Sequence, residues 1–206
     1  MSDLLLVVGL NGSPHPDGNT ASLLQQALEV VAAHGLHTEI IHCHQSLKSK
    51  NVPFCQGCEP RCTAKCYRGR EMEEHLRLLA RADAIIMASP VYFGTLSGQI
   101  KAFWDHSRLL RQNQLLLNTV GGGIAVGGSR FGGQEPALKI MHDIMLAHGM
   151  LVVGDGFSGY DCGHLGANCQ APAALDEHAI NRARLLGMRV SQVAEATSRL
   201  RKGVRK

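Results

Sequence analysis

The sequence is poor in aromatic residues and contains no long apolar run. Only 4% of its 206 residues are Phe, Trp or Tyr, and the basic residues are not interleaved with aromatic ones as in proteins that bind single-stranded nucleic acid. No segment approaches the roughly 18 consecutive apolar residues of a membrane-spanning helix. The short apolar opening at residues 4–10 lacks a preceding basic segment, so it predicts a buried strand rather than a signal peptide. We therefore expect a cytoplasmic protein with no nucleic-acid partner and no membrane partner.

The composition is typical of a soluble α/β protein. Hydrophobic residues make up 45% of the chain, charged residues make up 18%, and there are 23 glycines. A chain of 206 residues can bury one large core but is short for two independent domains. We expect one domain, residues 1–206, with a cysteine-rich insert at about residues 47–69.

Apolar runs of strand length alternate with helical patterns along the chain. The expected strands are residues 4–9, 38–43, 84–88, 119–126 and 151–153. The expected helices start at residue 19 or 20 and end before Gly35, and then cover residues 70–81, 97–110, 134–148 and 173–199. Such alternation indicates a parallel sheet with helices on both faces. The predicted fold is α/β, a flavodoxin-like three-layer sandwich with a five-stranded parallel sheet in the order 2-1-3-4-5, which binds ligands beyond the carboxyl ends of its strands.

The first strand is followed by a polar loop, GSPHPDGNT at residues 12–20, and then by a helix. Such a loop directs backbone N–H groups and hydroxyls at one point, where the dipole of the following helix favours an anion. The segment has neither the Lys-Ser/Thr pair of a Walker loop nor the GxGxxG pattern of a dinucleotide turn. It suits a phosphate monoester, and an ordinary polar turn with a helix cap is the alternative.

The third strand runs into a second distinctive segment, SPVYFGTLSGQIKAFWD at residues 89–105. The order GSP, GNT, SPVYFG and SGQIKAF resembles the NAD(P)H-dependent FMN reductase and iron–sulfur flavoprotein family of the flavodoxin-like superfamily. The resemblance extends over residues 4–150. It implies an oxidoreductase that binds FMN and receives electrons from NAD(P)H or from a ferredoxin-like donor.

The resemblance also implies which residues hold the flavin. The FMN phosphate would lie at Ser13, Asn19 and Thr20, with Pro14 shaping the turn. The residues beside the isoalloxazine ring would be Pro90, Val91, Tyr92, Phe93 and Gly94. A flat, electron-accepting ring needs apolar or aromatic contact and nearby backbone N–H groups, and Tyr92 or Phe93 can supply a stacking surface. The alternative is that both aromatic side chains belong to the core.

A third loop, GGSRFGGQE at residues 127–135, follows the fourth strand. It is similar to the family's glycine-rich loop that closes the flavin site, which implies Gly128, Ser129 and Gly133 as further cofactor contacts. A flexible connector is the alternative. The family often has a basic residue directly after the first-loop proline, whereas this sequence has His15 there and lacks that fixed positive charge.

Four of the seven cysteines, Cys55, Cys58, Cys62 and Cys66, form the compact pattern C-x2-C-x3-C-x3-C. Thiolates suit iron–sulfur clusters and zinc alike, but zinc sites more often use two separated cysteine pairs. We favour a [4Fe–4S] cluster, because iron–sulfur flavoproteins carry a compact cysteine motif at this place, although this spacing is not the commonest form. Zinc and metal-free redox-active thiols are the alternatives.

A second irregular segment is expected at residues 155–172, and it contains Cys162 and Cys169. These two thiols would form a redox pair or cap the site of a neighbouring subunit. Cys43, at the end of the second expected strand, is interpreted as a small buried hydrophobic residue.

The leading hypothesis is an FMN-dependent oxidoreductase that transfers electrons from NAD(P)H or a ferredoxin-like donor to a quinone, a free flavin or a partner protein. No catalytic side chain is named, because hydride chemistry belongs to the flavin. The alternative is a non-enzymatic one-electron carrier or redox sensor, and a zinc-stabilised binding module is a third hypothesis. The family resemblance further implies a homodimer or tetramer.

Overall fold

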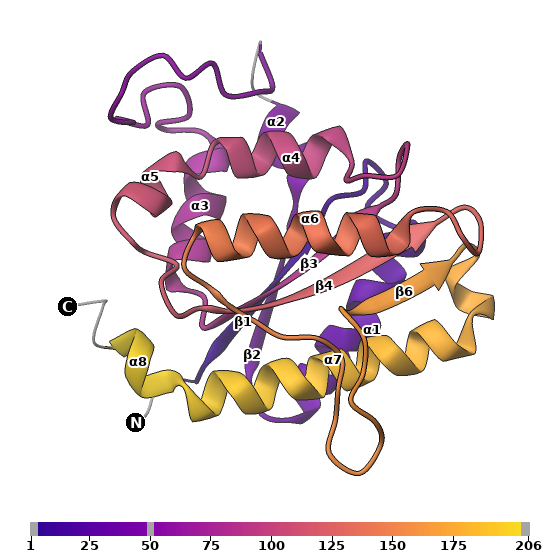
Figure 1. Cartoon of the computed structure of the whole chain (residues 1–206). Coiled ribbons are helices and arrows are strands. Elements are labelled where there is room, and N and C mark those ends of the chain that lie inside the picture. The colour runs from indigo at the N-terminus through magenta and orange to yellow at the C-terminus, as the bar shows by residue number, and fades with distance from the viewer. Residues whose placement is uncertain (1–3, 49–51, 203–206) are drawn as a thin grey trace.

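The computed structural model, which describes residues 4–48 and 52–202, is built around one parallel sheet. The strands are β1 (Leu6–Asn11), β2 (His37–His42), β3 (Ala84–Pro90), β4 (Val120–Gly127), β5 (Leu151–Val152) and β6 (Ala167–Gln170). All of the pairings between them are parallel, in the order β2-β1-β3-β4-β5, and β6 also pairs with β4 (Figure 1). The predicted strand order is confirmed.

The three central strands are buried along almost their whole length. Every residue of β1 and β4 is buried, and in β3 only the last residue is partly exposed. Strands that are covered on both faces read as continuous apolar runs in the sequence, which is why these three were recognisable. The edge strand β2 is different, because five of its six residues are partly or fully exposed and only Ile41 is buried.

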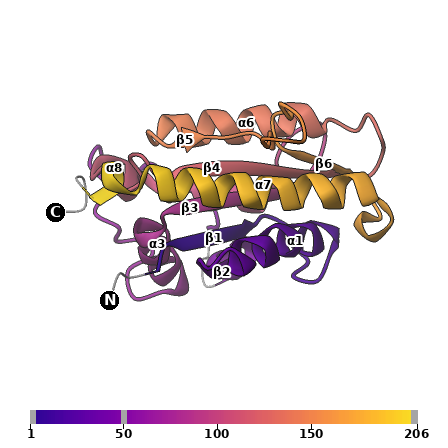
Figure 2. The same cartoon turned by 90° about the horizontal axis from the view of Figure 1, so that it is seen from below.

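Helices cover both faces of the sheet. One face is covered by α1 (Asn19–Ala33) and α7 (Glu177–Ala196), which run beside each other (Figures 1 and 2). The other face is covered by α3 (Glu71–Arg81), α4 (Gly98–Asp105) and α6 (Gln134–Ala147). The short elements are α2 (Cys43–Lys48), α5 (Arg108–Gln112), η1 (Ala173–Leu175) and α8 (Ser198–Lys202). Within the described ranges, no helix combines the length and the apolar character needed to cross a bilayer.

The fifth strand of the sheet is divided into two pieces. β5 pairs with the start of β4, and β6 pairs with its end, so residues 153–166 are inserted between the two halves. Arg182 of α7 anchors this insertion: its Nε donates to the Asp155 carboxylate at 2.5 Å, and its Nη1 donates to both Asp161 oxygens at 2.9 Å. The expectation that residues 155–172 are irregular throughout is wrong, because residues 167–170 form β6. The four residues of β6 are too few and too polar to show a strand pattern.

Two long helices of the sequence-based prediction are interrupted. The expected helix at 97–110 is divided into α4 and α5, because the N–H groups of His106 and Ser107 bond to carbonyls three residues back and the Ser107 hydroxyl donates to the Trp104 carbonyl at 2.7 Å. The expected helix at 173–199 becomes η1, α7 and α8. Asp176 caps α7, accepting the Ala179 N–H at 2.9 Å.

The second strand also ends earlier than expected. It stops at His42, and Cys43 begins α2 instead of ending the strand. The thiol of Cys43 is fully buried, as expected, and burial raises its pKa well above the ordinary value. A helix of six residues contains too few turns to leave a periodic signal in the sequence.

His148, directly after α6, is a half-buried histidine whose ring packs against Trp104 of α4. Its Nε2 lies 2.9 Å from the Ser107 hydroxyl oxygen, and since that hydroxyl donates to the Trp104 carbonyl, it accepts the Nε2–H of His148. The other ring nitrogen, Nδ1, is buried and has no hydrogen-bond partner in the described residues. Burial, assisted by the charge of Arg111, lowers the pKa of His148 from 6.5 to about 4.

We predict that His148→Gln makes the folded protein less sensitive to mild acid. The folded-state pKa of His148 lies below its unfolded value, so its contribution is complete above pH 6.5 and is lost as the pH falls toward about 4. The difference between the folded and unfolded pKa values corresponds to about 3 kcal/mol in the free energy of unfolding, at about 1.4 kcal/mol per pKa unit. Denaturant unfolding of both proteins at several pH values measures it, with the exposed His178→Gln as control. Parallel pH dependences for wild type and His148→Gln would contradict the assignment.

Candidate functional site

Three loops follow the carboxyl ends of β1, β3 and β4 and lie at the same edge of the sheet. They are residues 12–18, 91–97 and 128–133. All of the residues implied as cofactor contacts lie in these loops, at the end of β3 or in the first turn of α1. Parallel strands place their carboxyl ends side by side, and ligands of such sheets bind there.

The first loop is held to the sheet by its own backbone and by two short side chains. Gly12 donates its N–H to the Ala88 carbonyl at 2.8 Å, and Ser13 donates its N–H to the Asn11 side chain at 3.0 Å. The Ser13 hydroxyl accepts the N–H of His15 at 3.1 Å, so this serine shapes the loop. Pro14 follows it and is partly exposed.

The N-terminus of α1 has no side-chain cap. Gly18 is its N-cap residue, and no side chain accepts from the first turn. Thr20 is buried in that turn, whereas Asn19 is exposed and accepts the backbone N–H of Ala173 at 2.8 Å. Asn19 therefore joins the first loop to η1, a role that the sequence did not indicate. The uncapped N–H groups leave the positive end of the α1 dipole open to an anion.

The second loop is a tight turn that projects from the sheet. Tyr92 and Thr95 exchange two backbone hydrogen bonds of 3.0 and 3.1 Å, and Phe93 and Gly94 between them have φ values of +52° and +75°. Phe93 is fully exposed, at 107%, and Tyr92 is 42% exposed. The alternative that both aromatic residues belong to the core is therefore wrong.

The two residues before the turn lie against the edge of the sheet. Pro90 is the last residue of β3, and Val91 donates its N–H to the Val126 carbonyl at 2.8 Å while its side chain packs on the core.

A buried serine connects the first two loops. The hydroxyl of Ser97 donates to the Gly12 carbonyl at 2.6 Å, and the same oxygen accepts the N–H of Ile100 at 3.3 Å, which caps α4. Its backbone N–H donates to the Ser89 hydroxyl at 3.1 Å. The sequence indicated only a helix start at this position, because the partner in the first loop lies 85 residues away.

The third loop contacts the second through two glycines. Gly133 has a φ of +91°, and a Cβ at this position would lie 2.8 Å from the Cα of Gly94. The two backbones therefore approach more closely than any side chain allows. Gly128 and Ser129, the other implied contacts of this loop, are exposed.

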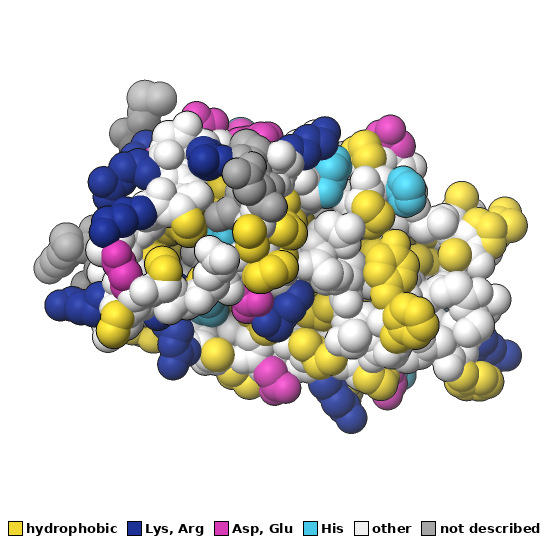
Figure 3. Space-filling view, turned by 90° about the horizontal axis from the view of Figure 1, so that it is seen from above, with side chains coloured by type: hydrophobic (Ala, Val, Ile, Leu, Met, Phe, Trp, Pro, Cys, Tyr) yellow, Lys and Arg dark blue, Asp and Glu magenta, His cyan; other side chains and the backbone are white. Residues whose placement is uncertain are grey.

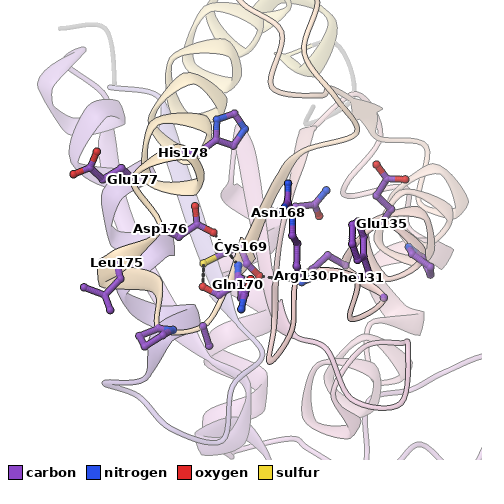
Figure 4. A pocket seen from close by; sticks show the side chains of 15 residues that line it. Arg130, Phe131, Glu135, Asn168, Cys169, Gln170, Leu175, Asp176, Glu177 and His178 are labelled. Carbon is purple, nitrogen blue, oxygen red and sulfur yellow. Dashed lines mark hydrogen bonds between the residues drawn. The ribbon is translucent and has the colours of Figure 1, made fainter.

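An open cavity of about 950 Å³ lies on the other side of the third loop, between α6, β6 and the start of α7. Figure 4 shows Phe131 and Glu135 on one wall, opposite Leu175 and Glu177. Gly133 is the one implied cofactor contact that lines it. This cavity and the edge formed by the three loops are thus neighbouring but different places.

The cysteine segment is an open loop above α4 and α5 without helix or strand (Figure 1). Two residues of α5 hold it. Gln112 accepts the N–H of Cys62 at 2.5 Å and donates to the carbonyl of the same residue at 3.2 Å. Arg108 donates to the carbonyls of Glu59 and Pro60 at 3.0 and 3.2 Å.

The thiols of Cys55, Cys62 and Cys66 lie near the buried Tyr67, but the thiols of this segment do not converge on a metal site. Burial, with smaller effects of Cys62, Cys66 and Cys55, raises the pKa of Tyr67. Across residues 4–48 and 52–202, no three His, Cys, Asp or Glu side chains are close enough together to hold a metal ion. The donor types suit a cluster, but their arrangement is not that of a closed site.

The other two cysteines differ in their environments. Cys162 is exposed in the insertion, whereas Cys169 is buried in β6. Burial, with a smaller effect of Asp176, raises the pKa of Cys169 to about 12. This thiol is therefore a poor thiolate donor or nucleophile at neutral pH. No disulfide joins any of the seven cysteines, all of which lie in the described ranges.

Comparison with known proteins identifies the family. The NADPH-dependent FMN reductase family matches residues 5–164. The chain belongs to this family. It is similar to an iron–sulfur flavoprotein of Methanocaldococcus jannaschii, with 40% identity over 195 residues that cover 92% of this chain and 97% of the relative. An iron–sulfur flavoprotein of Methanosarcina thermophila is 37% identical over 172 residues, covering 82% and 85% of the two chains.

A solved structure supports the fold independently. The flavodoxin-type, WrbA-like protein of Agrobacterium tumefaciens aligns with a TM-score of 0.64 at 22% identity, covering 94% of this chain and 99% of the other. As a member of the FMN reductase family, the protein is an oxidoreductase of the flavoprotein type. The first loop of this reductase fits the FMN phosphate, because an uncapped helix N-terminus suits an anion.

We predict that Gly133→Ala lowers the free energy of unfolding of this reductase by about 1–2 kcal/mol, because alanine is strained at positive φ and its Cβ would collide with Gly94. Gly128→Ala is the matched control, since a Cβ there meets no atom within 4 Å. We expect that variant to stay within about 0.5 kcal/mol of wild type. Urea unfolding measures both, and equal losses would show that the contact between the two loops is not tight.

Proposed function

We propose that this protein binds one FMN at the edge formed by the three loops and uses it to transfer electrons. The observation that carries the proposal is the meeting of the uncapped N-terminus of α1 with two loops whose glycines touch. The phosphate contacts would be Ser13, Asn19 and Thr20, with Pro14 shaping the turn. The ring contacts would be Pro90, Val91, Tyr92, Phe93, Gly94, Gly128, Ser129 and Gly133.

Bound FMN supplies the hydride and single-electron chemistry. The chain supplies binding and orientation. The N–H groups of the first turn of α1 favour the phosphate dianion, and the exposed rings of Tyr92 and Phe93 offer flat apolar surface. Since His15 replaces a fixed cation, anion binding in this loop depends mainly on backbone N–H groups.

The electron donor is NAD(P)H or a ferredoxin-like protein, and the acceptor is a quinone, a free flavin or a partner protein. The family description supports NADPH as donor. The names of the two archaeal relatives support a protein that also carries iron and sulfur. A cytoplasmic location is part of the proposal.

A homodimer or tetramer is part of the proposal. Four large apolar side chains are exposed near the flavin edge and the cysteine segment: Phe54 at 59%, Tyr92 at 42%, Phe93 at 107% and Phe131 at 93%. Figure 3 shows apolar side chains exposed on the face that carries this region. Exposed aromatic residues of this kind are typical of surfaces that a partner covers.

The second part of the proposal is a [4Fe–4S] cluster bound by Cys55, Cys58, Cys62 and Cys66. It is supported by the four thiols and by the relatives' names. Because the thiols do not converge in this structure, the segment must close around the cluster, and no electron-transfer step is derived through it. Residues 52–66 contain no helix or strand, so closure would not have to break one.

We predict that the purified protein, reconstituted with FMN and desalted, retains the visible flavin absorption band and loses it on anaerobic addition of NAD(P)H. Steady NAD(P)H oxidation after a quinone is added as electron acceptor would exclude a pure electron carrier, whereas reduction only by a ferredoxin would favour the carrier. A colourless protein after desalting would refute FMN binding.

We predict that anaerobically purified protein contains roughly four irons and four sulfides per chain, and that Cys58→Ser lowers both without removing FMN. The exposed Cys162→Ser is the matched control and is expected to keep the full iron content. About one zinc without sulfide would establish a zinc site instead, and flavin with no metal would leave the thiols without a cluster.

A further inference from the structure

Gln134, the first residue of α6, is buried under the loop that joins β4 to α6. Its residue is only 6% exposed, and its amide makes three hydrogen bonds. Nε2 donates to the carbonyls of Ser129 at 2.7 Å and Cys169 at 3.3 Å, while Oε1 accepts the N–H of Gly132 at 2.9 Å. One side chain thus closes the loop on itself and ties it to β6.

The groups around the end of the Gln134 side chain match an amide. Two carbonyl oxygens face the nitrogen of Gln134 and one N–H faces its oxygen, so both ends of the amide are matched. The space is provided by Gly127, where a Cβ would lie only 2.4 Å from Nε2 of Gln134. A glycine at the end of β4 and a glutamine at the start of α6 therefore form one unit.

We propose that Gln134 is a positioning residue for the flavin loop and sets the affinity of the protein for FMN, an inference that rests on the proposed function. Gln134 is not among the proposed flavin contacts and acts through residues 128–133. Its bond to Gly132 fixes the backbone directly before Gly133, and Gly133 is the residue that touches Gly94 of the second loop. Loss of the amide removes the bond between the third loop and β6, and it removes the restraint on the backbone next to the Gly133–Gly94 contact.

Two substitutions separate the hydrogen bonding of this side chain from its shape. Gln134→Leu leaves two carbonyls and one N–H without their partner, and Gln134→Glu places a carboxylate against the same two carbonyls. Leaving buried polar groups unpaired is costly, so we expect the Kd for FMN to rise about tenfold or more in both variants. Protonation gives Gln134→Glu one O–H donor, so its affinity recovers as the pH falls, whereas that of Gln134→Leu does not follow this pattern.

The experiment is a titration of each apoprotein with FMN, followed by quenching of flavin fluorescence, at mildly alkaline and mildly acidic pH. The flavin midpoint potential is measured on the same samples. Gln25→Leu, in an exposed residue of α1, controls for loss of a glutamine. Arg182→Met controls for lost stability, because the hydrogen bonds of this buried side chain go to Asp155 and Asp161 of the insertion and not to residues 128–133.

The outcomes are distinguishable. Weaker FMN binding in both Gln134 variants, with pH-dependent recovery in Gln134→Glu alone and neither change in the controls, supports the inference. If the unaltered protein binds FMN and Gln134→Leu binds it equally tightly, the inference is wrong and the proposed function stands. If the unaltered protein binds no FMN, both are wrong. Should Gln134→Leu not fold, Gln134→Glu compared with itself at the two pH values decides, and an absence of recovery overturns the inference.

Discussion

Burial of β1, β3 and β4 on both faces is the constraint on which the rest of the structure depends. These strands have no polar face, so they are stable only between two helical layers, and parallel pairing follows from the crossover helices that supply those layers. Parallel pairing in turn brings the ends of all three strands to one edge. The three loops meet there because the core requires it, and their chemistry is added to a position that the packing has already determined.

Contacts between the loops convert this common edge into one connected site. Ser97 bonds to the carbonyl of Gly12, and Gly133 lies against Gly94, so each loop is restrained by a loop that follows a different strand. Preorganisation of this kind reduces the ordering that a bound cofactor would otherwise impose. The exposed aromatic turn at Tyr92 and Phe93 is the part that these contacts leave uncovered.

The cysteine segment, in contrast, is not held together by contacts between its functional side chains. It is held through its backbone, by Gln112 and Arg108, and its thiols are not brought together by secondary structure. The insertion in the fifth strand has little regular structure, like the cysteine segment. It is nevertheless anchored by the buried guanidinium of Arg182, which bonds to Asp155 and Asp161. The fold thus has three connected loops at one edge of the sheet and, elsewhere, a segment rich in thiols without helix or strand.

The sequence by itself determined the fold class, the strand order and the positions of the three loops, because these depend on local apolar runs, on turn residues and on motifs contiguous in the chain. The exposure of Tyr92 and Phe93, the division of the fifth strand and the breaks after α4 and η1 were decided only by the tertiary structure. The same is true of Gln134, Ser97 and Asn19, whose partners include residues 35, 85 and 154 positions away. A hydrogen bond across such a separation leaves no periodic pattern in the sequence, so only folding could show that these residues hold the site together.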